Sequence, residues 1–300
     1  MNDSIVEVAA GAASGALSKT IMAPLDRLKL VVQLRSELSS KDAREAYKGP
    51  WRSLQKIFKE ESFLALWRGN TPTVLIQAGT SGMNFCFMDL FKKAAVDVFG
   101  EEQRFAQSFA SAALGGATAI TVFYPLGLMR TKLALDMGND PREYPRGMRD
   151  VASKSVQSNG ITSLFQGYGV ALVSVTVYRM IHLGGYDYAK SELQRRQSFS
   201  SEYNFKQLPL WQRVAVAQLV SVAATTFHYP FDSVRRRLMM QSDASKKRYA
   251  NALDCTQQIF RNEGIRGFYQ GLGTSYIRSV GAALLLLSYD FFKSILISQR

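Results

Sequence analysis

The feature that most constrains this 300-residue chain is a short proline-centred pattern that occurs three times. An acidic residue follows the proline by two positions, and a basic residue follows it by five. The copies lie roughly 100 residues apart: Pro24, Asp26 and Lys29; Pro125, Gly127 and Arg130; Pro230, Asp232 and Arg235. Glycine therefore replaces the acid in the middle copy. A regular internal repeat of this kind predicts one body built from three similar units rather than two soluble domains.

Each copy predicts a bent helix that carries a charge pair on one side. A proline inside an apolar helical run bends the helix, and residues three apart share a helical face. For a single copy, a turn followed by an ordinary helix start would be the simpler interpretation. Three copies in register instead favour three equivalent helices that converge on a common axis, where an acid of one helix meets a base of the next.

Long uncharged stretches indicate that the helices cross a membrane, despite a mean hydropathy of −0.08. Residues 69–88, 105–129 and 214–231 contain no Asp, Glu, Lys or Arg, and the first two reach the roughly 20 residues that span a bilayer. Three further candidate spans each include an isolated cation in their apolar part. They are residues 5–36 with Lys19, 168–190 with Arg179 and 272–295 with Arg278. Because an ionisable group in a membrane helix usually faces a watery cavity or a partner, we predict six spans, two per unit.

The proline pattern and its surroundings resemble the mitochondrial carrier family. The third copy continues into a sequence similar to the signature of the ADP/ATP carrier branch, with leucine in place of one methionine: Arg235, Arg236, Arg237, Leu238, Met239 and Met240. The likeness extends over nearly the whole chain. It implies an all-α membrane protein with six transmembrane helices in three pseudo-symmetric repeats, 1–100, 101–203 and 204–300, each with a short surface helix.

The resemblance assigns two gates to the charged residues. The matrix gate would comprise residues that follow the three prolines: Asp26, Lys29, Gln33, Arg130, Asp232 and Arg235. By family analogy Asp26 pairs with Arg130 and Asp232 pairs with Lys29, whereas Gly127 leaves Arg235 without an acid. The cytoplasmic gate would comprise acid–base pairs three residues apart at the ends of the even spans: Asp89 and Lys92, Asp187 and Lys190, Asp290 and Lys293.

Five glycines flank the expected surface helices at positions that hold cardiolipin in the family: Gly49, Gly69, Gly147, Gly167 and Gly271. A glycine next to a helix N-terminus leaves backbone N–H groups free to bind an anion. An equally consistent interpretation is that Gly69, Gly167 and Gly271 only let the chain turn into the following span.

The intramembrane cations favour an anionic substrate, although a membrane arginine can also satisfy helix carbonyls or reach the interface. The family positions imply a substrate site that comprises Lys19, Ile76, Asn84, Ser174, Val175, Tyr178, Arg179 and Arg278. Three departures from the branch fall here: Ile76 replaces an arginine, Ser174 and Val175 replace a Gly-Ile pair, and His228 replaces a serine. The site therefore loses one phosphate contact, and its apolar slot for the base gains a hydroxyl.

Composition indicates which partners the chain attracts and which kinds of site and activity it argues against. A net charge of +13 indicates attraction to anionic lipid or an anionic solute. The basic residues are not interleaved with aromatic residues in short runs, so we expect no nucleic acid. Two cysteines are too few for a zinc site, and no catalytic signature occurs, so we expect no metal, no cofactor and no enzymatic activity. Residues 1–10 lack the pattern of a signal or transit peptide, so targeting information is expected to be internal.

These features lead to one main hypothesis and two alternatives. We expect a monomeric, multi-pass carrier of the mitochondrial inner membrane that exchanges ADP and ATP by alternating access, with cardiolipin as a lipid partner. The first alternative is a carrier for another anionic nucleotide, a cofactor or a phosphorylated metabolite. The second is a non-transporting or proton-leak relative, which Lys19 and Arg278 argue against and with which Gly127 and Ile76 are compatible.

Overall fold

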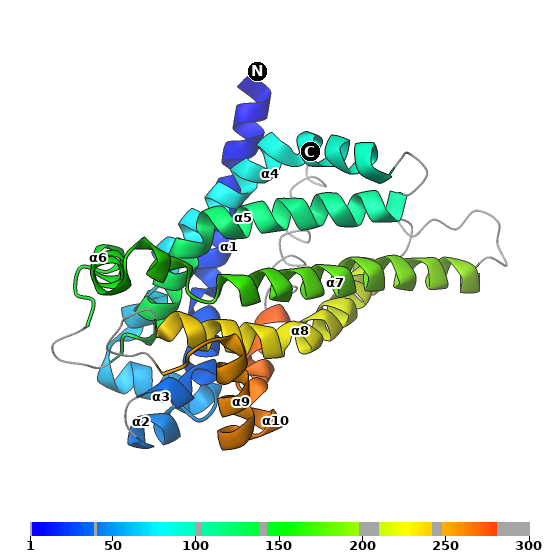
Figure 1. Ribbon diagram of the computed structural model, residues 1–300. Helices are drawn as coiled ribbons and strands as arrows, with labels where there is room; N and C mark the ends of the chain where they lie inside the picture. The colour runs from blue at the N-terminus through cyan, green and yellow to red at the C-terminus, as the bar shows by residue number, and fades with distance from the viewer. Residues whose placement is uncertain are drawn as a thin grey trace, which may run out of the picture.

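Long helices form the frame of the molecule. The computed structural model describes residues 2–38, 41–99, 104–137, 143–197, 210–241 and 248–280. The long helices are α1 (Asn2–Gln33), α4 (Asn70–Phe99), α5 (Arg104–Leu135), α7 (Tyr168–Gln197) and α8 (Leu210–Met240), and residues 272–280 are helical as well (Figure 1). No strand occurs in these ranges, so the predicted all-α class is confirmed for the described part of the chain.

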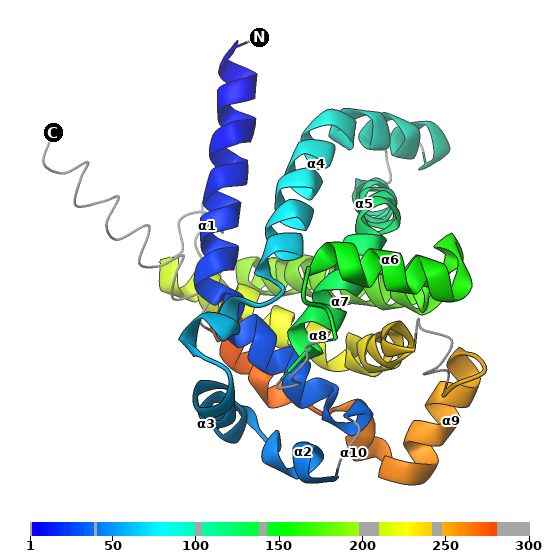
Figure 2. The same ribbon diagram turned by 90° about the vertical axis from the view of Figure 1, so that its left-hand side faces the viewer.

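Short helices connect the long ones. They are α2 (Lys41–Ala46), α3 (Pro50–Glu60), α6 (Met148–Asn159), α9 (Ala252–Glu263) and α10 (Ile265–Phe268), with 3₁₀ turns at Arg35–Glu37, Phe63–Trp67 and Ile161–Phe165. They include the one surface helix per unit that the sequence predicts: α3, α6 and α9. Local sequence explains their starts. Helix α3 begins at Pro50, which has no N–H to leave unpaired, and the Asn251 side chain caps α9 by accepting from the Asp254 N–H at 2.8 Å. Helices α3, α6 and α9 lie around the periphery in Figure 2.

The three prolines lie inside long helices, where the sequence predicts bends. Pro24 is in α1, Pro125 in α5 and Pro230 in α8. Each removes one helical hydrogen bond. The change of direction along α1 is plain in Figure 2, and that along α8 in Figure 1.

The core is divided among the three units. The buried apolar residues form three clusters, each where a short helix packs on a bent one. Ile57 of α3 belongs to the cluster of α1, Val151 of α6 to that of α5, and Ile259 of α9 to that of α8. All three side chains are at most 1% exposed. Apolar burial where the short helices pack on the bent ones stabilises the ends of the bent helices that carry the charged residues.

The long helices also carry apolar side chains on their outer surfaces. Leu17 of α1, Leu219 and Phe227 of α8 and Val122 of α5 are more than half exposed. Residues Ile161–Ala189 and Gln212–Met240 form helical stretches that are long and apolar enough to cross a membrane by length and composition. Extensive exposed apolar surface of this kind is typical of helices that contact lipid.

Candidate functional site

Charged side chains of α1, α5 and α8 meet directly after the three prolines. We call Asp26, Lys29, Arg130, Asp232 and Arg235 the charged ring. Arg130 Nη2 donates to Asp26 Oδ2 at 2.7 Å, and Lys29 Nζ lies 3.6 Å from Asp232 Oδ2. The structure thus brings together both pairs that the resemblance implies, and they join α1 to α5 and α1 to α8. Gln33 Nε2 reinforces the second pair by donating to Asp232 Oδ2 at 3.2 Å.

The third contact of the charged ring, between α5 and α8, differs from the two ion pairs. Arg235 is next to no carboxylate of α5, because Gly127 has no side chain there. Its guanidinium instead lies over the ring of Tyr124, 5.2 Å from the centroid. The Nε atom of Arg235 is buried and has no hydrogen-bond partner among the described residues. A cation–π contact therefore stands where the other helix pairs have ion pairs.

The three consecutive arginines of the signature point in different directions, because neighbouring positions on a helix are about 100° apart. Arg236 Nε donates to Asp232 one turn earlier at 2.8 Å. Arg237 faces away from the ring and donates to both carboxylate oxygens of Glu263 in α9, at 2.5 and 2.8 Å. The Leu238 and Met239 side chains are buried. The signature thus combines charged groups at the ring with a structural tie between α8 and α9.

Two predicted substrate residues adjoin the charged ring. Arg278 Nε lies 3.6 Å from Asp26 Oδ1, and Lys19 is within electrostatic range of Asp26, Arg130 and Arg278. Six cations therefore surround two carboxylates, an excess of four positive charges among the described residues: Lys19, Lys29, Arg130, Arg235, Arg236 and Arg278 around Asp26 and Asp232. A region with such an excess attracts anions, and its charges interact more strongly than they would in bulk water.

An aromatic cluster lies between α7 and α8. The Tyr178 ring stacks on His182 with centroids 5.5 Å apart and meets His228 edge-on at 5.1 Å. His182 Nε2 is 3.2 Å from Ser221 Oγ, and His228 Nδ1 is 3.0 Å from the Thr225 carbonyl oxygen. The sequence identifies Tyr178 and His228 through the resemblance but gives no signal for His182, whose neighbours depend on how α7 and α8 pack.

Other predicted substrate residues have different surroundings. Ser174 is 2% exposed and offers a ligand no accessible hydroxyl in this conformation, while Ile76 and Val175 are half-buried. Arg179 lies against α5, since a Cβ added to Gly116 would be 2.6 Å from Arg179 Nε. Asn84 belongs to α4, but its side chain lies outside the described residues.

The predicted cytoplasmic gate falls mostly outside the described part of the structure. Asp187 is exposed near the end of α7. The side chains of Asp89, Lys92 and Lys190, and all of Asp290 and Lys293, lie outside the described residues. The cytoplasmic gate therefore stays a prediction.

Three of the predicted lipid-binding glycines are at close contacts between helices. Gly69, Gly167 and Gly271 have φ values of +85°, +79° and +81°, which favour glycine. A Cβ added to Gly69 would lie 3.1 Å from the Arg130 carbonyl oxygen. One added to Gly167 would lie 3.0 Å from the Arg235 carbonyl oxygen, and one added to Gly271 would lie 3.1 Å from the Gln33 nitrogen. Each glycine thus packs on the bent helix of the next repeat around the bundle. This contact supports the interpretation that these glycines serve the turn and the packing.

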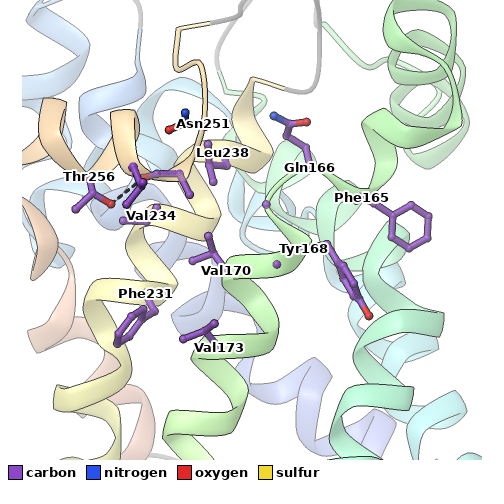
Figure 3. A pocket seen from close by; sticks show the side chains of 14 residues that line it. Phe165, Gln166, Tyr168, Val170, Val173, Phe231, Val234, Leu238, Asn251 and Thr256 are labelled. Carbon is purple, nitrogen blue, oxygen red and sulfur yellow. Dashed lines mark hydrogen bonds between the residues drawn. The ribbon is translucent and has the colours of Figure 1, made fainter.

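Two surface pockets adjoin two of these glycines, Gly167 and Gly69. One, of about 710 Å³, is lined by Gly167, by apolar side chains of α7 and α8, and by Ala252 at the start of α9. Figure 3 shows Val170, Val173 and Phe231 along one part of this pocket. Another, of about 530 Å³, is lined by both Gly69 and Gly147, so two predicted lipid-binding positions distant in sequence share one pocket. Each pocket joins adjacent repeats.

Comparison with known proteins identifies the family. A family model described as mitochondrial carrier protein matches three consecutive stretches, 2–98, 101–197 and 206–300, which confirms the three-repeat organisation. ADP/ATP translocase 4 from Homo sapiens is 36% identical over 292 residues, covering 96% of this chain and 90% of the relative. The mitochondrial substrate carrier family protein ancA from Dictyostelium discoideum is 35% identical over 283 residues, covering 93% and 89%. ADP/ATP translocase 3 from Homo sapiens is 36% identical over 295 residues, covering 96% of each. The chain belongs to the mitochondrial carrier family.

Proposed function

We propose that the protein is a six-span carrier of the mitochondrial inner membrane that exchanges ADP and ATP by alternating access. The observation that carries this proposal is the excess of four positive charges around Asp26 and Asp232. A nucleotide di- or triphosphate supplies several negative charges and many acceptor oxygens, and guanidinium and ammonium groups bind them through charge-assisted hydrogen bonds. The names of the relatives, ADP/ATP translocases 3 and 4, support the adenine nucleotides as substrates.

The charged ring is closed in this conformation, and its geometry suggests how a substrate opens it. Asp26 is shared, since Arg130 donates to Oδ2 and Arg278 lies 3.6 Å from Oδ1. A phosphate bound to Arg278 would draw that cation away from Asp26. Arg130 would then be the main partner of Asp26. The binding free energy of the substrate would then offset part of the cost of separating α1 from α5.

The surface pockets suit a phospholipid in the same proposal. The pocket of Figure 3 combines apolar walls of α7 and α8 with residues at the start of α9, Asn251, Ala252 and Leu253. The apolar wall can hold acyl chains, and a helix N-terminus favours a phosphate. We therefore assign cardiolipin to these pockets, at Gly69 and Gly147 and at Gly167, with Gly49 and Gly271 at the remaining junction. The working unit in this proposal is a monomer.

A second candidate is a carrier of another anion in the same cavity. Ile76, the buried hydroxyl of Ser174 and the cluster of Tyr178, His182 and His228 favour it, because they change the charge and the shape of the site. Uptake of labelled ADP by the reconstituted protein, competed with other nucleotides, cofactors and phosphorylated metabolites, separates the two. The ADP/ATP proposal expects unlabelled ADP and ATP to compete best. Stronger competition by another anion would support the second candidate, and no uptake of any anion would support a non-transporting relative.

A further inference from the structure

A second group of cations lies away from the charged ring, at the junction of the first and third repeats. A pocket of about 370 Å³ opens there between the end of α1 and α9, and Arg35, Arg44, Arg237 and Arg248 contribute to its lining. Within the described part of the chain, all eleven residues that line it have polar side chains. This composition contrasts with the apolar groove of Figure 3, so the pocket lacks a surface for acyl chains.

The carboxylates at this pocket already have cationic partners. Both oxygens of Glu263 accept from Arg237, and Glu37 lies 3.7 Å from Arg237 and 3.4 Å from Arg248. The Tyr249 hydroxyl donates to Glu37 at 2.8 Å. At the rim, Glu45 pairs with Lys48 at 3.3 Å. These contacts hold Glu37 of the first repeat against the third repeat and leave no lining carboxylate without a cation.

Arg35 and Arg44 are different, because within the described part of the chain neither has a carboxylate at ion-pair distance. Arg35 Nε reaches the Gln270 side-chain oxygen at 3.4 Å, and Arg44 Nε donates to the Leu38 carbonyl oxygen at 2.9 Å. Among the described residues no hydrogen bond involves their terminal nitrogen atoms, which can therefore donate to a ligand. The hydroxyl oxygen of Ser36, which lines the same pocket, is buried and has no hydrogen-bond partner among the described residues.

We propose that this pocket is a second anion site, which binds a soluble polyphosphate between Arg35 and Arg44 of the first repeat and Arg248 of the third. Guanidinium groups bind phosphate oxygens through paired hydrogen bonds. Arg35 and Arg44 supply two positive charges without a described carboxylate partner, and Arg248, which pairs with Glu37, adds further hydrogen-bond donors. A bound anion would join the first repeat to the third on the side of the charged ring. It would therefore stabilise the conformation in which the ring is closed.

The test is thermal unfolding of the purified full-length protein with inorganic diphosphate, at constant ionic strength set with sodium chloride. We expect diphosphate to raise the unfolding midpoint of the unmodified protein. A response should persist in Arg278→Ala, which lacks a cation of the proposed substrate site, and it should be unchanged in Arg52→Gln, a control at an exposed arginine of α3. In the double variant Arg35→Gln, Arg44→Gln the diphosphate concentration that gives half of the effect should rise at least about tenfold, because charge-assisted hydrogen bonds are lost.

Two results would overturn the proposal. The first is an unchanged response in the double variant together with a lost response in Arg278→Ala, which would place the diphosphate at the charged ring. The second is equal stabilisation by sodium chloride alone, which would indicate a general salt effect. If the double variant does not fold, Arg44→Gln alone serves, and an unchanged half-effect concentration in that variant contradicts the proposal.

Discussion

A Cβ atom added to Gly127 of α5 would lie 3.8 Å from Nη2 of Arg235 in α8. Gly127 occupies the position where the other two repeats have Asp26 and Asp232. The space for a third interhelical ion pair therefore exists, and the cation for it is in place over Tyr124. Only the carboxylate is lacking, so α5 and α8 are joined less strongly at the charged ring than the other two helix pairs.

Gly127→Asp should complete the ring. The new carboxylate can accept from Arg235, whose Nε has no hydrogen-bond partner in the described residues. A partly buried pair of this kind contributes about 1 kcal/mol or more, and replacing a helical glycine contributes a further ~0.5–1 kcal/mol. We expect a higher unfolding temperature without substrate and slower exchange, because the ring must open in each cycle.

Gly127→Ala is the matched control for that variant, since it supplies the gain in helix propensity without the charge. The aspartate variant should exceed the alanine variant in stability and fall below it in exchange rate. Equal stability and equal rates in the two variants would show that the third position of the ring does not act as a gate.

Arg278→Ala should weaken binding of the anionic substrate while the protein stays folded. Arg278 is only partly buried and its contact with Asp26 is long, at 3.6 Å, so its loss costs the fold little. Loss of a charge-assisted hydrogen bond of ~1.5–3 kcal/mol to phosphate corresponds to a drop of roughly ten- to a hundredfold in affinity. Exchange rates and the ADP-dependent rise in unfolding temperature measure this drop in affinity. Arg266→Ala, at an exposed arginine of α10, is the control, and equal behaviour of the two variants would exclude Arg278 from the site.

Gly271→Ala should destabilise the protein more than Gly49→Ala. Both glycines have positive φ, +81° and +103°, so alanine strains the backbone at both by about 1–2 kcal/mol. At Gly271 the new Cβ would also press on the Gln33 nitrogen at 3.1 Å, whereas at Gly49 no heavy atom of the described residues lies within 4 Å of it. Overpacking adds about 1–3 kcal/mol. Thermal unfolding of the two variants measures the difference in stability. Equal decreases in unfolding temperature would mean that the contact between Gly271 and Gln33 adjusts to the added methyl group without loss of stability.

Cys255 of α9 should resist alkylation in the folded protein. Burial, with smaller contributions from Glu37, Asp254 and Glu263, raises the pKa of this thiol to about 12. Because the thiolate is the nucleophile, a maleimide at pH 7–8 should label Cys255 slowly in a Cys86→Ser variant and rapidly after denaturation. The stabilisation from the neutral thiol is complete below its pKa in the unfolded chain and is lost as pH rises towards 12. Fast labelling of the native variant would show that α9 detaches readily from α8.

The sequence predicts the parts of the site that follow from the repeat. The register of the three copies predicts that an acid of one helix meets a base of the next, and the family resemblance specifies the pairs that the structure shows, Asp26 with Arg130 and Asp232 with Lys29. It also predicts the short helix in each unit. Lys19 and Arg278 stand out as lone cations in apolar surroundings, and the structure places both beside Asp26.

The remaining contacts depend on packing that a repeat pattern does not encode. The sequence does not reveal that Arg237 turns away from Arg235 and Arg236 to bind Glu263, since that depends on the rotation of α8 about its axis. Arg179 appears in sequence as a cavity cation, yet it lies against Gly116. His182 joins Tyr178 only because they are one helical turn apart on a face that α8 covers.

The central claim, exchange of adenine nucleotides through this site, is tested most directly by counter-exchange in liposomes. The reconstituted protein is given external labelled ADP, and the liposomes contain either unlabelled ADP or none. The account predicts rapid uptake into loaded liposomes and little into empty ones, because the cost of opening the ring is offset only when a substrate occupies the site on each side. Equal uptake into loaded and empty liposomes, or uptake into neither, would contradict it.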